Sequence, residues 1–478
     1  MAHSTAGAPH TDAHDRPPPA GPRRWAALAL ICVAQFMLVL DVTVVNVALP
    51  DMAADLDLDR EALTWVVTAY TLCFGGLMLL GGRLADALGA RRTLLAGLAL
   101  FTTASLVTGL AQNAPMLLGG RIGQGVGAAL LSPAALSVVT TAFHGAERNK
   151  ALGVWSAIGG AGAAAGVVLG GALTDGPGWP WVFYVNVPVG LLLLAVLPTL
   201  VPARAPLPAR LDIPGALLVT TGTAALIYGL VEAGDAGWTG AASLLPLTGA
   251  VVAYTAFVAV ERASRAPLMD LRMFTRRPVL AGVFLMLVAT ALLISFFFLG
   301  SAYLQHVRGF SPLRTGLLFL PVAVATGVGA HVGSRLVGRI GSRPTAVAGM
   351  AVAAAGTVPL TRLPENGSVY AGLLPGFVLA SLGIGAVLVT AGTTALGMVE
   401  HREAGLASGV VNTAHEVGGS IGVAVVSSVA AAGFERGSAG GFGDAFTVCA
   451  VAAAAGAVVA LGLVPRGTPQ QAGGPHVH

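Results

Sequence analysis

The chain has 478 residues, of which 55% are hydrophobic and only 10% are charged. A soluble globular domain carries about 25% charged residues, so this chain has too little polar surface to coat a water-soluble core, and a soluble protein is excluded. The formal net charge is +4, and the basic residues are spread over many loops, which gives no support to nucleic-acid binding.

Residues 1–24 are rich in His, Pro and Ala and lack an apolar run, so we expect a disordered cytoplasmic tail there and a second one at residues 465–478. The first apolar stretch, 25–49, is too long for a cleaved signal sequence and is expected to remain as a helix. Thirteen further stretches approach or exceed the roughly 20 residues that one crossing needs: 62–81, 93–111, 115–141, 150–173, 181–201, 213–232, 241–260, 279–304, 314–333, 344–361, 369–397, 404–432 and 443–464. Because a backbone in lipid must satisfy its own polar groups, we predict an all-α membrane protein with fourteen transmembrane helices.

The basic residues give an orientation. Lys and Arg fall mostly in every second connection between the apolar stretches, and cytoplasmic loops of membrane proteins are enriched in these residues. Both termini are therefore predicted to be cytoplasmic. The three cysteines, Cys32, Cys73 and Cys449, lie inside apolar stretches without CxxC spacing, so we expect buried free thiols, with no disulfide framework and no metal site.

One short segment of the chain is repeated. Residues 82–92 read GRLADALGARR and residues 334–344 read SRLVGRIGSRP, each after a predicted span. If each marks the same loop of a six-helix half, the halves are residues 25–201 and 279–464, and residues 202–278 form an inserted two-helix hairpin with flanking cytoplasmic linkers. Repeated halves around a central cavity are the usual build of secondary transporters.

The first copy of this segment resembles the G-x-L-A-D-x-x-G-x-[RK]-[RK] signature of the major facilitator superfamily, and the chain as a whole resembles its fourteen-span drug:proton antiporter branch. Further motifs carry the same resemblance. They are LDVTVVNVALP at residues 40–50, the R-x-x-Q-G pattern of Arg121, Gln124 and Gly125, the spaced glycines Gly153, Gly162, Gly166, Gly170 and Gly171, and NVPVG at residues 186–190. The resemblance covers about residues 25–464.

The resemblance implies proton-coupled efflux of hydrophobic small molecules, cations among them, such as antibiotics or dyes, and hence drug resistance. It implies a major facilitator fold, a multi-pass monomer in the bacterial cytoplasmic membrane, and the proton gradient as energy source with no cofactor. Two residues depart from the family pattern: Val167 stands where the antiporter motif usually has proline, which weakens the case for export over uptake, and Pro180 stands where an arginine is usual.

Charged residues inside predicted spans are the candidate functional residues, because a charge at mid-bilayer is costly unless it is paired or faces a wet cavity. Asp41 and Arg121 lie at similar depth and are expected to pair, either as a proton-coupling site or as a static ion pair. Glu416, near the middle of its span, is expected to couple protons and bind substrate together with Asn412 and Gln124, or to be a buried structural carboxyl. Adjacent His415 points about 100° away and is expected to be packed.

The loop motif has a mechanical interpretation. Its residues Gly82, Asp86, Gly89, Arg91 and Arg92 are expected to form a conformational latch, with Asp86 beside the positive N-terminal end of the thirteenth span, around residues 403–405. The alternative is a surface turn whose arginines only set the orientation, which applies most to Arg83.

Enzymatic functions are not supported, because the sequence has no nucleotide-binding loop, no HExxH and no GxSxG motif. Three alternatives to general drug efflux stay open: export of one metabolite made by the same cell, uptake by symport, and a non-transporting membrane sensor. The charged set Asp41, Arg121 and Glu416 favours transport over a sensor.

Overall fold

The computed structural model describes residues 21–143, 145–202, 212–233, 236–264, 267–268, 271–363, 368–396, 404–431 and 439–466. Throughout these residues the regular secondary structure is helical, which confirms the predicted all-α fold. The elements from the first predicted half are α1 (Pro22–Leu56), α2 (Arg60–Leu88), α3 (Ala90–Gly109), α4 (Ala114–Ala142), α5 (Gly145–Asp175), α6 (Trp181–Tyr184) and α7 (Asn186–Leu200).

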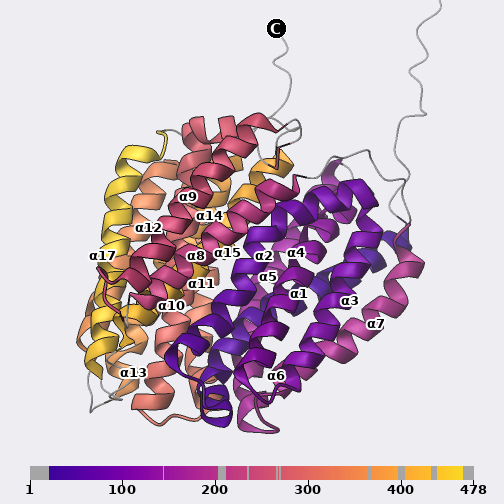
Figure 1. Cartoon of the computed structure of the whole chain (residues 1–478). Coiled ribbons are helices and arrows are strands. Elements are labelled where there is room, and N and C mark those ends of the chain that lie inside the picture. Colours follow the sequence, from indigo (N-terminus) through magenta and orange to yellow (C-terminus); the bar gives the residue numbers. More distant parts are fainter. Residues whose placement is uncertain are drawn as a thin grey trace, which may run out of the picture.

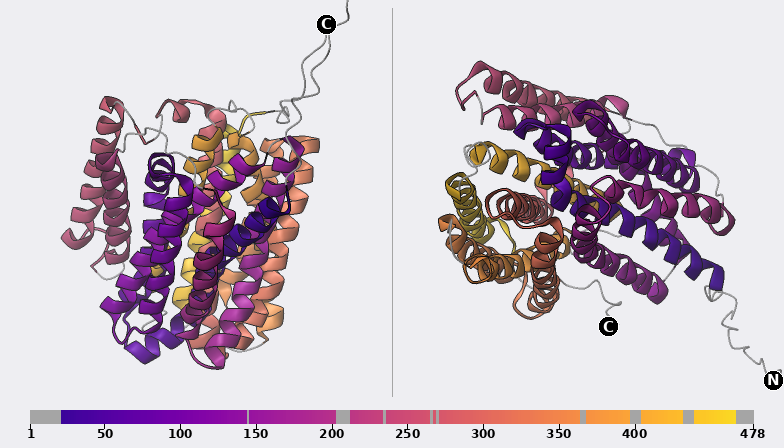
Figure 2. Two further views of the ribbon diagram at one scale, coloured as in Figure 1. Left: turned by 90° about the vertical axis from the view of Figure 1, so that its right-hand side faces the viewer. Right: turned by 90° about the horizontal axis from the view of Figure 1, so that it is seen from below.

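The central pair is α8 (Ile213–Glu232) and α9 (Ala241–Ala263). The remaining elements are η1 (Leu271–Thr275), α10 (Arg277–Ala302), η2 (Tyr303–Val307), α11 (Pro312–Ile340), α12 (Ser342–Thr357), η3 (Val358–Arg362), α13 (Val369–Gly372), α14 (Leu374–Leu396), α15 (Ala404–Val429) and α17 (Ala439–Leu463). Figures 1 and 2 show α1–α7 gathered on one side and α10–α17 on the other. The α8 and α9 helices pack on each other, and α8 contacts both α2 and α15.

Within the described residues, 12 helices are long and apolar enough to cross a membrane. The 31-residue α5 and the 26-residue α15 are not among them, and only Ala165–Asp175 of α5 counts as a shorter apolar helix. The predicted number of fourteen spans is therefore not confirmed by length and hydropathy alone.

Several helices begin at a capping side chain, and α2 and α4 are examples. Asp59 accepts a hydrogen bond from the Ala62 amide at the start of α2, at 2.8 Å, and Asn113 accepts one from the Met116 amide at the start of α4, at 3.0 Å. These oxygens satisfy amides that have no partner inside the helix. Short polar connections thus divide the apolar stretches into separate helices.

The repeated loop segment has a repeated backbone. Gly89 joins α2 to α3 with φ of 93°, and Gly341 joins α11 to α12 with φ of 91°. A side chain is strained in this region, so glycine suits both turns. The sequence repeat that suggested two related halves therefore corresponds to two turns of similar backbone conformation, one in each half.

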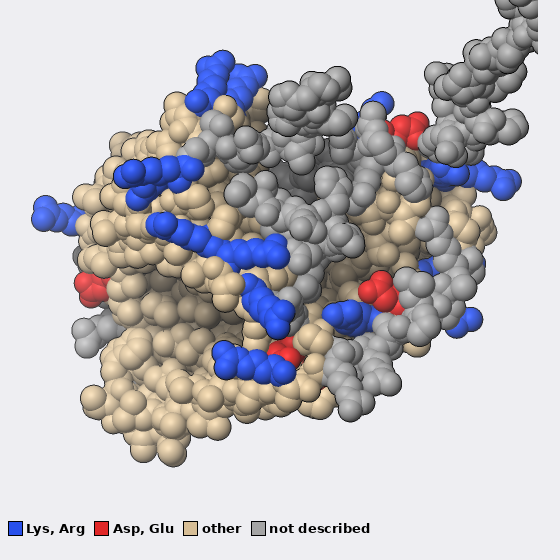
Figure 3. Space-filling view, turned by 90° about the horizontal axis from the view of Figure 1, so that it is seen from above, with Lys and Arg blue, Asp and Glu red and all other residues tan. Residues whose placement is uncertain are grey.

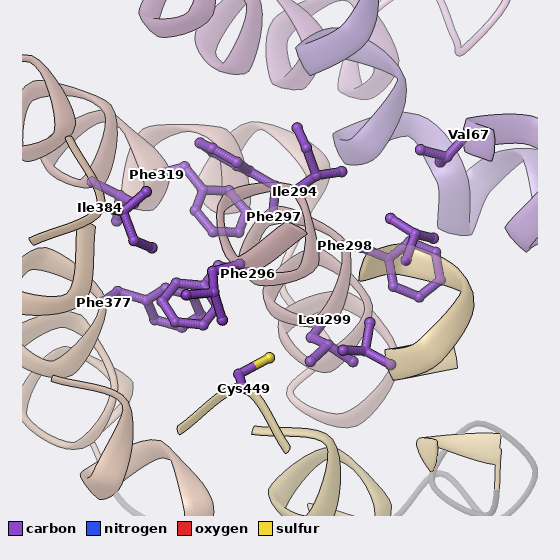
Figure 4. Packing of buried hydrophobic residues seen from close by; sticks show 14 of the residues in the cluster. Val67, Ile294, Phe296, Phe297, Phe298, Leu299, Phe319, Phe377, Ile384 and Cys449 are labelled. Atoms are coloured by element: carbon purple, nitrogen blue, oxygen red, sulfur yellow. The ribbon is translucent and has the colours of Figure 1, made fainter. Parts of the chain in front are cut away.

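Two large apolar cores hold the helices. One is built from α1–α5 and α7, and the other mainly from α10–α17 together with residues of α1, α2, α4, α5 and α6. Figure 4 shows the second core, where the ring of Phe296 packs edge-on to that of Phe377 with centroids 5.6 Å apart, near Cys449. All three cysteines are free thiols; Cys32 and Cys449 are buried as predicted, but Cys73 is only partly buried.

Candidate functional site: a central cavity beside a buried ion pair

A cavity of about 1150 Å³ lies between the two groups of helices. Its walls come from α1, α2, α4 and α5 on one side and from α10, α11, α14 and α15 on the other. Along α2 the lining extends from Thr71 to Asp86, which is about 22 Å at 1.5 Å per residue. The cavity therefore reaches from the middle of the bundle to the end of α2.

The bundle has two ends, and the cavity extends toward one of them. We call the end where α1 starts and α17 finishes the tail end, and the opposite one the far end. At the tail end, Asp86, Thr140 and Trp155 line the cavity. Figure 3 looks down on this face, where Lys and Arg side chains outnumber Asp and Glu.

Toward the far end the two groups of helices pack directly together. Thr64 on α2 and Ser427 on α15 share a hydrogen bond of 2.6 Å between their hydroxyls. The Gln305 amide donates to the Val47 carbonyl at 2.8 Å. These contacts between α2 and α15 and between η2 and α1 close the far side, so the cavity has the geometry of a site loaded from the tail end.

Asp41 and Arg121 form a salt bridge beside the cavity, with 2.5 Å between Asp41 Oδ2 and the guanidinium. Their exposed fractions are 0% and 1%. The predicted pairing is therefore present in the structure. Neither side chain lines the cavity, although the neighbouring Thr43 does.

Every oxygen of the Asp41 carboxylate is satisfied. Besides Arg121 at Oδ2, Oδ1 accepts from Gln124 at 2.9 Å and from Asn186 at 3.0 Å. Arg121 also donates to the Val66 carbonyl of α2 at 2.9 Å. A buried ion pair is tolerated only when hydrogen bonds satisfy its remaining groups, and α2, α4 and α7 supply them here. The network holds α1, α2, α4 and α7 together.

Gln124 was expected to bind substrate, but its side chain lies in the network around the ion pair. Its side chain is fully buried, accepts from Arg121, and donates to Asp41 and Ser105, the latter at 2.8 Å. It is not among the residues that line the cavity. Its expected role as a substrate ligand does not fit this conformation, because its amide is already used to orient the ion pair.

Glu416 and Asn412 both line the cavity from α15, as a substrate-binding role requires. The expectation that His415 is packed away is wrong: it lines the same cavity, its side chain is 40% exposed, and its Nδ1 lies 3.1 Å from Glu416 Oε1. An angle of 100° between neighbouring helix positions still lets both side chains border a cavity this wide. The pair is the main ionisable feature of the cavity's inner part.

Glu416 is held against α2 by a glycine. A Cβ placed on Gly75 would lie 2.6 Å from the Glu416 Cβ, so only glycine allows α15 to approach this closely. One turn away, the Thr71 and Ser420 hydroxyls are 2.5 Å apart. Sequence reasoning missed these α2 contacts, since the only signal was a glycine and a threonine in an apolar span.

The loop motif lies at the cavity mouth. Gly82, Arg83 and Asp86 line the cavity, and Asp86 is exposed. The guanidinium of Arg91 donates to the Pro198 carbonyl at the end of α7, at 2.8 Å, and Arg92 is exposed. The expected latch partner of Asp86 is the start of the thirteenth span, around residues 403–405, where residue 403 and the side chains of residues 404 and 405 are outside the described part of the chain.

Arg83 makes a specific contact, beyond any part it plays in setting the orientation of the protein in the membrane. Its guanidinium donates to the Pro267 carbonyl, at 2.7 Å, in the segment that follows α9. The next residue, Leu268, also lines the cavity. The segment that follows α9 therefore contributes to the wall of the cavity.

The spaced glycines of α5 pack against neighbouring helices. A Cβ on Gly162 would lie 3.2 Å from Val39, and one on Gly170 would lie 3.0 Å from Val44, both on α1. Gly166 faces Thr43 in the same row, Gly171 faces Leu313 of α11, and the side-chain environment of Gly153 is outside the described residues. This matches small-residue packing between membrane helices.

The two departures from the family pattern have defined places. Val167 is fully buried, and its carbonyl would lie 2.5 Å from a Cβ on Gly316, so α5 and α11 cross there without a proline. Pro180 is the residue before α6, with φ of −58°.

Comparison with known proteins shows the family to which most of the helical region is similar. Residues 31–423 match the Major Facilitator Superfamily. The chain is 42% identical over 416 residues to the puromycin resistance protein pur8 of Streptomyces alboniger, covering 85% of this chain and 82% of that protein. It is 40% identical over 454 residues to the cephamycin export protein CmcT of Amycolatopsis lactamdurans, covering 93% of each.

A third relative is the lincomycin resistance protein of Streptomyces lincolnensis, 38% identical over 92% of this chain and 90% of that protein. Among solved structures, a peptide transporter POT mutant superposes with a TM-score of 0.65 at 17% identity, over 92% of this chain and 96% of that one. A bacterial homologue of the lysosomal transporter Spinster, crystallised in an inward-facing conformation, gives 0.62 at 17% identity, over 93% and 96%. The structural likeness supports the fold alone.

Proposed function

The chain belongs to the Major Facilitator Superfamily, and on that premise we propose that it is a proton-coupled exporter of hydrophobic small molecules, with amine cations among its substrates. Membership makes it a transporter and not an enzyme, in a family that generally needs no cofactor. Relatives named as antibiotic resistance and export proteins support efflux as the direction of transport.

We propose fourteen spans, with α5 and α15 crossing the membrane beside the 12 apolar helices, as in the drug:proton antiporter branch. Residues 25–201 and 279–464 are then the two six-helix halves, and residues 202–278 carry the α8–α9 hairpin. The tail end faces the cytoplasm of a bacterial cell in this topology, because its basic face follows the positive-inside rule. The protein is proposed to act as a monomer.

One observation carries the proposed mechanism: a carboxylate that borders the cavity lies on a helix packed against the same α2 that binds the buried Asp41–Arg121 pair. A cation entering from the cytoplasm can reach Glu416, whereas Asp41 is reached only after the network rearranges. Proton and amine compete for the Glu416 carboxylate, so substrate binding releases a proton, which is the simplest coupling scheme.

The latch acts on the conformational equilibrium. With the tail end open, as here, Asp86 is exposed at the mouth. When the tail end closes, Asp86 is proposed to dock at the start of α15, where the helix dipole favours a carboxylate. The contact then stabilises the outward-facing state, and the Gly171–Leu313 and Gly316–Val167 crossings of α5 and α11 separate.

A dedicated exporter of one self-made compound is the second candidate. It is favoured by relatives named after single antibiotics, puromycin, cephamycin and lincomycin. A 1150 Å³ cavity accepts compounds of many shapes, which favours broader selection.

The test is an efflux assay in a drug-sensitive bacterial strain that expresses the chain. Puromycin, lincomycin and a panel of dyes are supplied with and without a protonophore, and Asp41→Asn serves as the inactive control. We expect raised resistance to several amine compounds, lost when the protonophore is present. Resistance confined to one compound would favour the dedicated exporter, and resistance unaffected by the protonophore would refute proton coupling.

A further inference from the structure

Thr290 is a residue of the cavity wall to which the mechanism above gives no role. It lies in α10, its exposed fraction is 1%, and its hydroxyl has no hydrogen-bond partner within the described part of the chain. Ten buried side-chain polar atoms of the described residues have no partner, and of their residues Thr290 alone lines the cavity. A buried hydroxyl without a partner is destabilising, so this group calls for a partner that it meets in another state.

The other threonines that line the cavity already use their hydroxyl protons. Four of them donate to a backbone carbonyl of their own helix: Thr43, Thr71, Thr140 and Thr326. Thr326, on α11, donates to the Val322 carbonyl at 3.0 Å. A helical threonine commonly forms such a bond. The Thr290 hydroxyl does not form it, and its proton therefore stays available to a ligand in the cavity.

Close packing between α10 and α15 fixes the place of Thr290 relative to Glu416. A Cβ on Gly418 would lie 2.5 Å from the Leu287 carbonyl oxygen, so the two backbones are in contact. A Cβ on Gly419 would lie 3.7 Å from the methyl carbon of Thr290. Because residues three apart on a helix have Cβ atoms about 5–6 Å apart, the Glu416 Cβ lies within about 10 Å of that methyl carbon. One small molecule can therefore contact both side chains.

Thr290 is the polar member of an otherwise apolar row on α10. Leu293, Ile294 and Phe297 follow it at helical spacing and line the same cavity. Because α10 begins beside the end of α17, at the tail end, these three residues lie beyond Thr290 toward the far end. A substrate that enters from the tail end thus meets an unpartnered hydroxyl near the carboxylate, followed by an apolar wall.

We propose that the Thr290 hydroxyl sets the substrate preference by donating a hydrogen bond to a carbonyl next to the amine that Glu416 binds. The preferred substrates are then α-amino carbonyl compounds whose apolar substituent lies against residues 293–297. In such a compound the nitrogen and the oxygen are separated by three bonds and lie about 3 Å apart. With a hydrogen bond of about 2.8 Å at each end, the group spans about 8 Å. That span fits the separation between the two side chains.

The hydroxyl can reach the substrate without any movement of the backbone. A helical threonine occupies two χ1 rotamers, and rotation by about 120° brings the hydroxyl to a new staggered position. A bound carbonyl then satisfies a group that is otherwise buried alone, whereas a cation without an acceptor leaves it unsatisfied. This inference rests on the proposed binding of amines by Glu416 and adds a preference among cations.

The discriminating variant is Thr290→Val, which keeps the shape of the side chain and removes the hydroxyl. Two cations are bound separately to the purified protein: puromycin, whose amine is next to an amide carbonyl, and tetraphenylphosphonium, which has no hydrogen-bond acceptor. The readout is the ratio of the two affinities. Thr290→Ser tests rescue, because serine keeps the hydroxyl. Thr326→Val is the matched control, since that hydroxyl already donates to the Val322 carbonyl.

We expect Thr290→Val to weaken puromycin binding about threefold to tenfold, which is the range for one neutral hydrogen bond. Binding of tetraphenylphosphonium should change less than twofold. Thermal stability should be kept or raised, because the variant removes a buried hydroxyl without a partner. Thr290→Ser should keep the wild-type ratio of affinities, and Thr326→Val should change both affinities by the same factor.

Three results would overturn the proposal. If the wild type binds neither cation, the proposed binding of cationic compounds fails, and the preference with it. If the wild type binds tetraphenylphosphonium but not puromycin, or if Thr290→Val binds puromycin as tightly as the wild type does, the preference alone is wrong. If Thr290→Val weakens both cations equally, or if Thr290→Ser does not keep the ratio, Thr290 acts through the shape of the cavity and not through a hydrogen bond.

Discussion

The Arg121 guanidinium lies 2.5 Å from Asp41 Oδ2 in a salt bridge that is buried from solvent, and it also donates a hydrogen bond to the Val66 carbonyl of α2. The charge on Asp41 therefore decides how firmly α1 and α4 are tied to α2. A proton on Asp41 removes the ionic attraction and leaves the guanidinium with neutral partners. A single protonation can in this way loosen the contact of three helices without changing any apolar packing.

Asp41→Asn is expected to lower proton-driven efflux at least tenfold while the protein still inserts and folds, because an amide keeps the volume and some hydrogen bonds but cannot be deprotonated. Efflux from inverted vesicles measures the effect, and Asp444→Asn, at an exposed position of α17, is the control. Arg121→Ala should be as damaging. If both residues act as one switch, the double variant is little worse than either single one; full additivity would indicate separate roles.

Gly75→Ala is expected to destabilise the conformation with the tail end open, because the added methyl would lie 2.6 Å from the Glu416 Cβ and 3.3 Å from the Val417 amide nitrogen. Overpacking of this kind costs about 1–3 kcal/mol, so α15 must move away from α2. Thermal unfolding in detergent and puromycin affinity should both fall. Gly119→Ala is the control, since nothing lies within 4 Å of a Cβ there; equal behaviour of the two variants would contradict close α2–α15 contact.

Asp86→Ala is expected to slow transport several-fold with substrate affinity largely intact, because a latch shifts the equilibrium between conformations and not the binding site. The readouts are the maximal efflux rate and the affinity, measured separately. Glu147→Ala, another acidic residue at the tail end, is the control because it does not line the cavity. Parallel loss of affinity and rate would mean that Asp86 contacts the substrate.

Much of the fold follows from sequence because membrane helices depend on long apolar stretches. The helical class, the connections and the pairing of Asp41 with Arg121 were all predictable, the last from equal depth in two spans. The matching turns at Gly89 and Gly341 were predictable as well, because the short sequence repeat places a glycine at the same point of both segments.

The details of the site depend on helix rotation, which apolar composition leaves undetermined. Gln124 turns toward Asp41 and Ser105 and away from the cavity, while His415 turns into it. The role of Gly75 depends on how closely α2 approaches α15. Such distances come from packing between distant segments, and a single sequence does not report them.

His415→Gln is expected to strengthen puromycin binding threefold to tenfold at pH 5.5 and to have little effect at pH 8. Histidine is the side chain that commonly gains a charge as the pH falls from 8 to about 5, and at the lower pH an imidazolium beside Glu416 repels an amine cation and pairs with the carboxylate. Binding of puromycin to purified protein across this pH range is the measurement. An effect of equal size at both pH values would show that the side chain acts through shape and not through charge.

Glu416→Gln is expected to lose amine substrates selectively. The substitution keeps the size of the side chain and its packing against Gly75, but removes the charge that a cation would pair with and the proton that it would displace. Efflux of puromycin, which carries an amine, should fall at least tenfold, while any neutral compound that the wild type exports should be exported at near wild-type rates. Asn412→Ala is the companion variant, because Asn412 borders the same cavity without a charge and should weaken both classes about equally. If Glu416→Gln lowers both classes to the same extent, the residue serves general coupling or structure; if neither class changes, Glu416 is a structural carboxyl at the cavity wall, and the proton must be exchanged elsewhere.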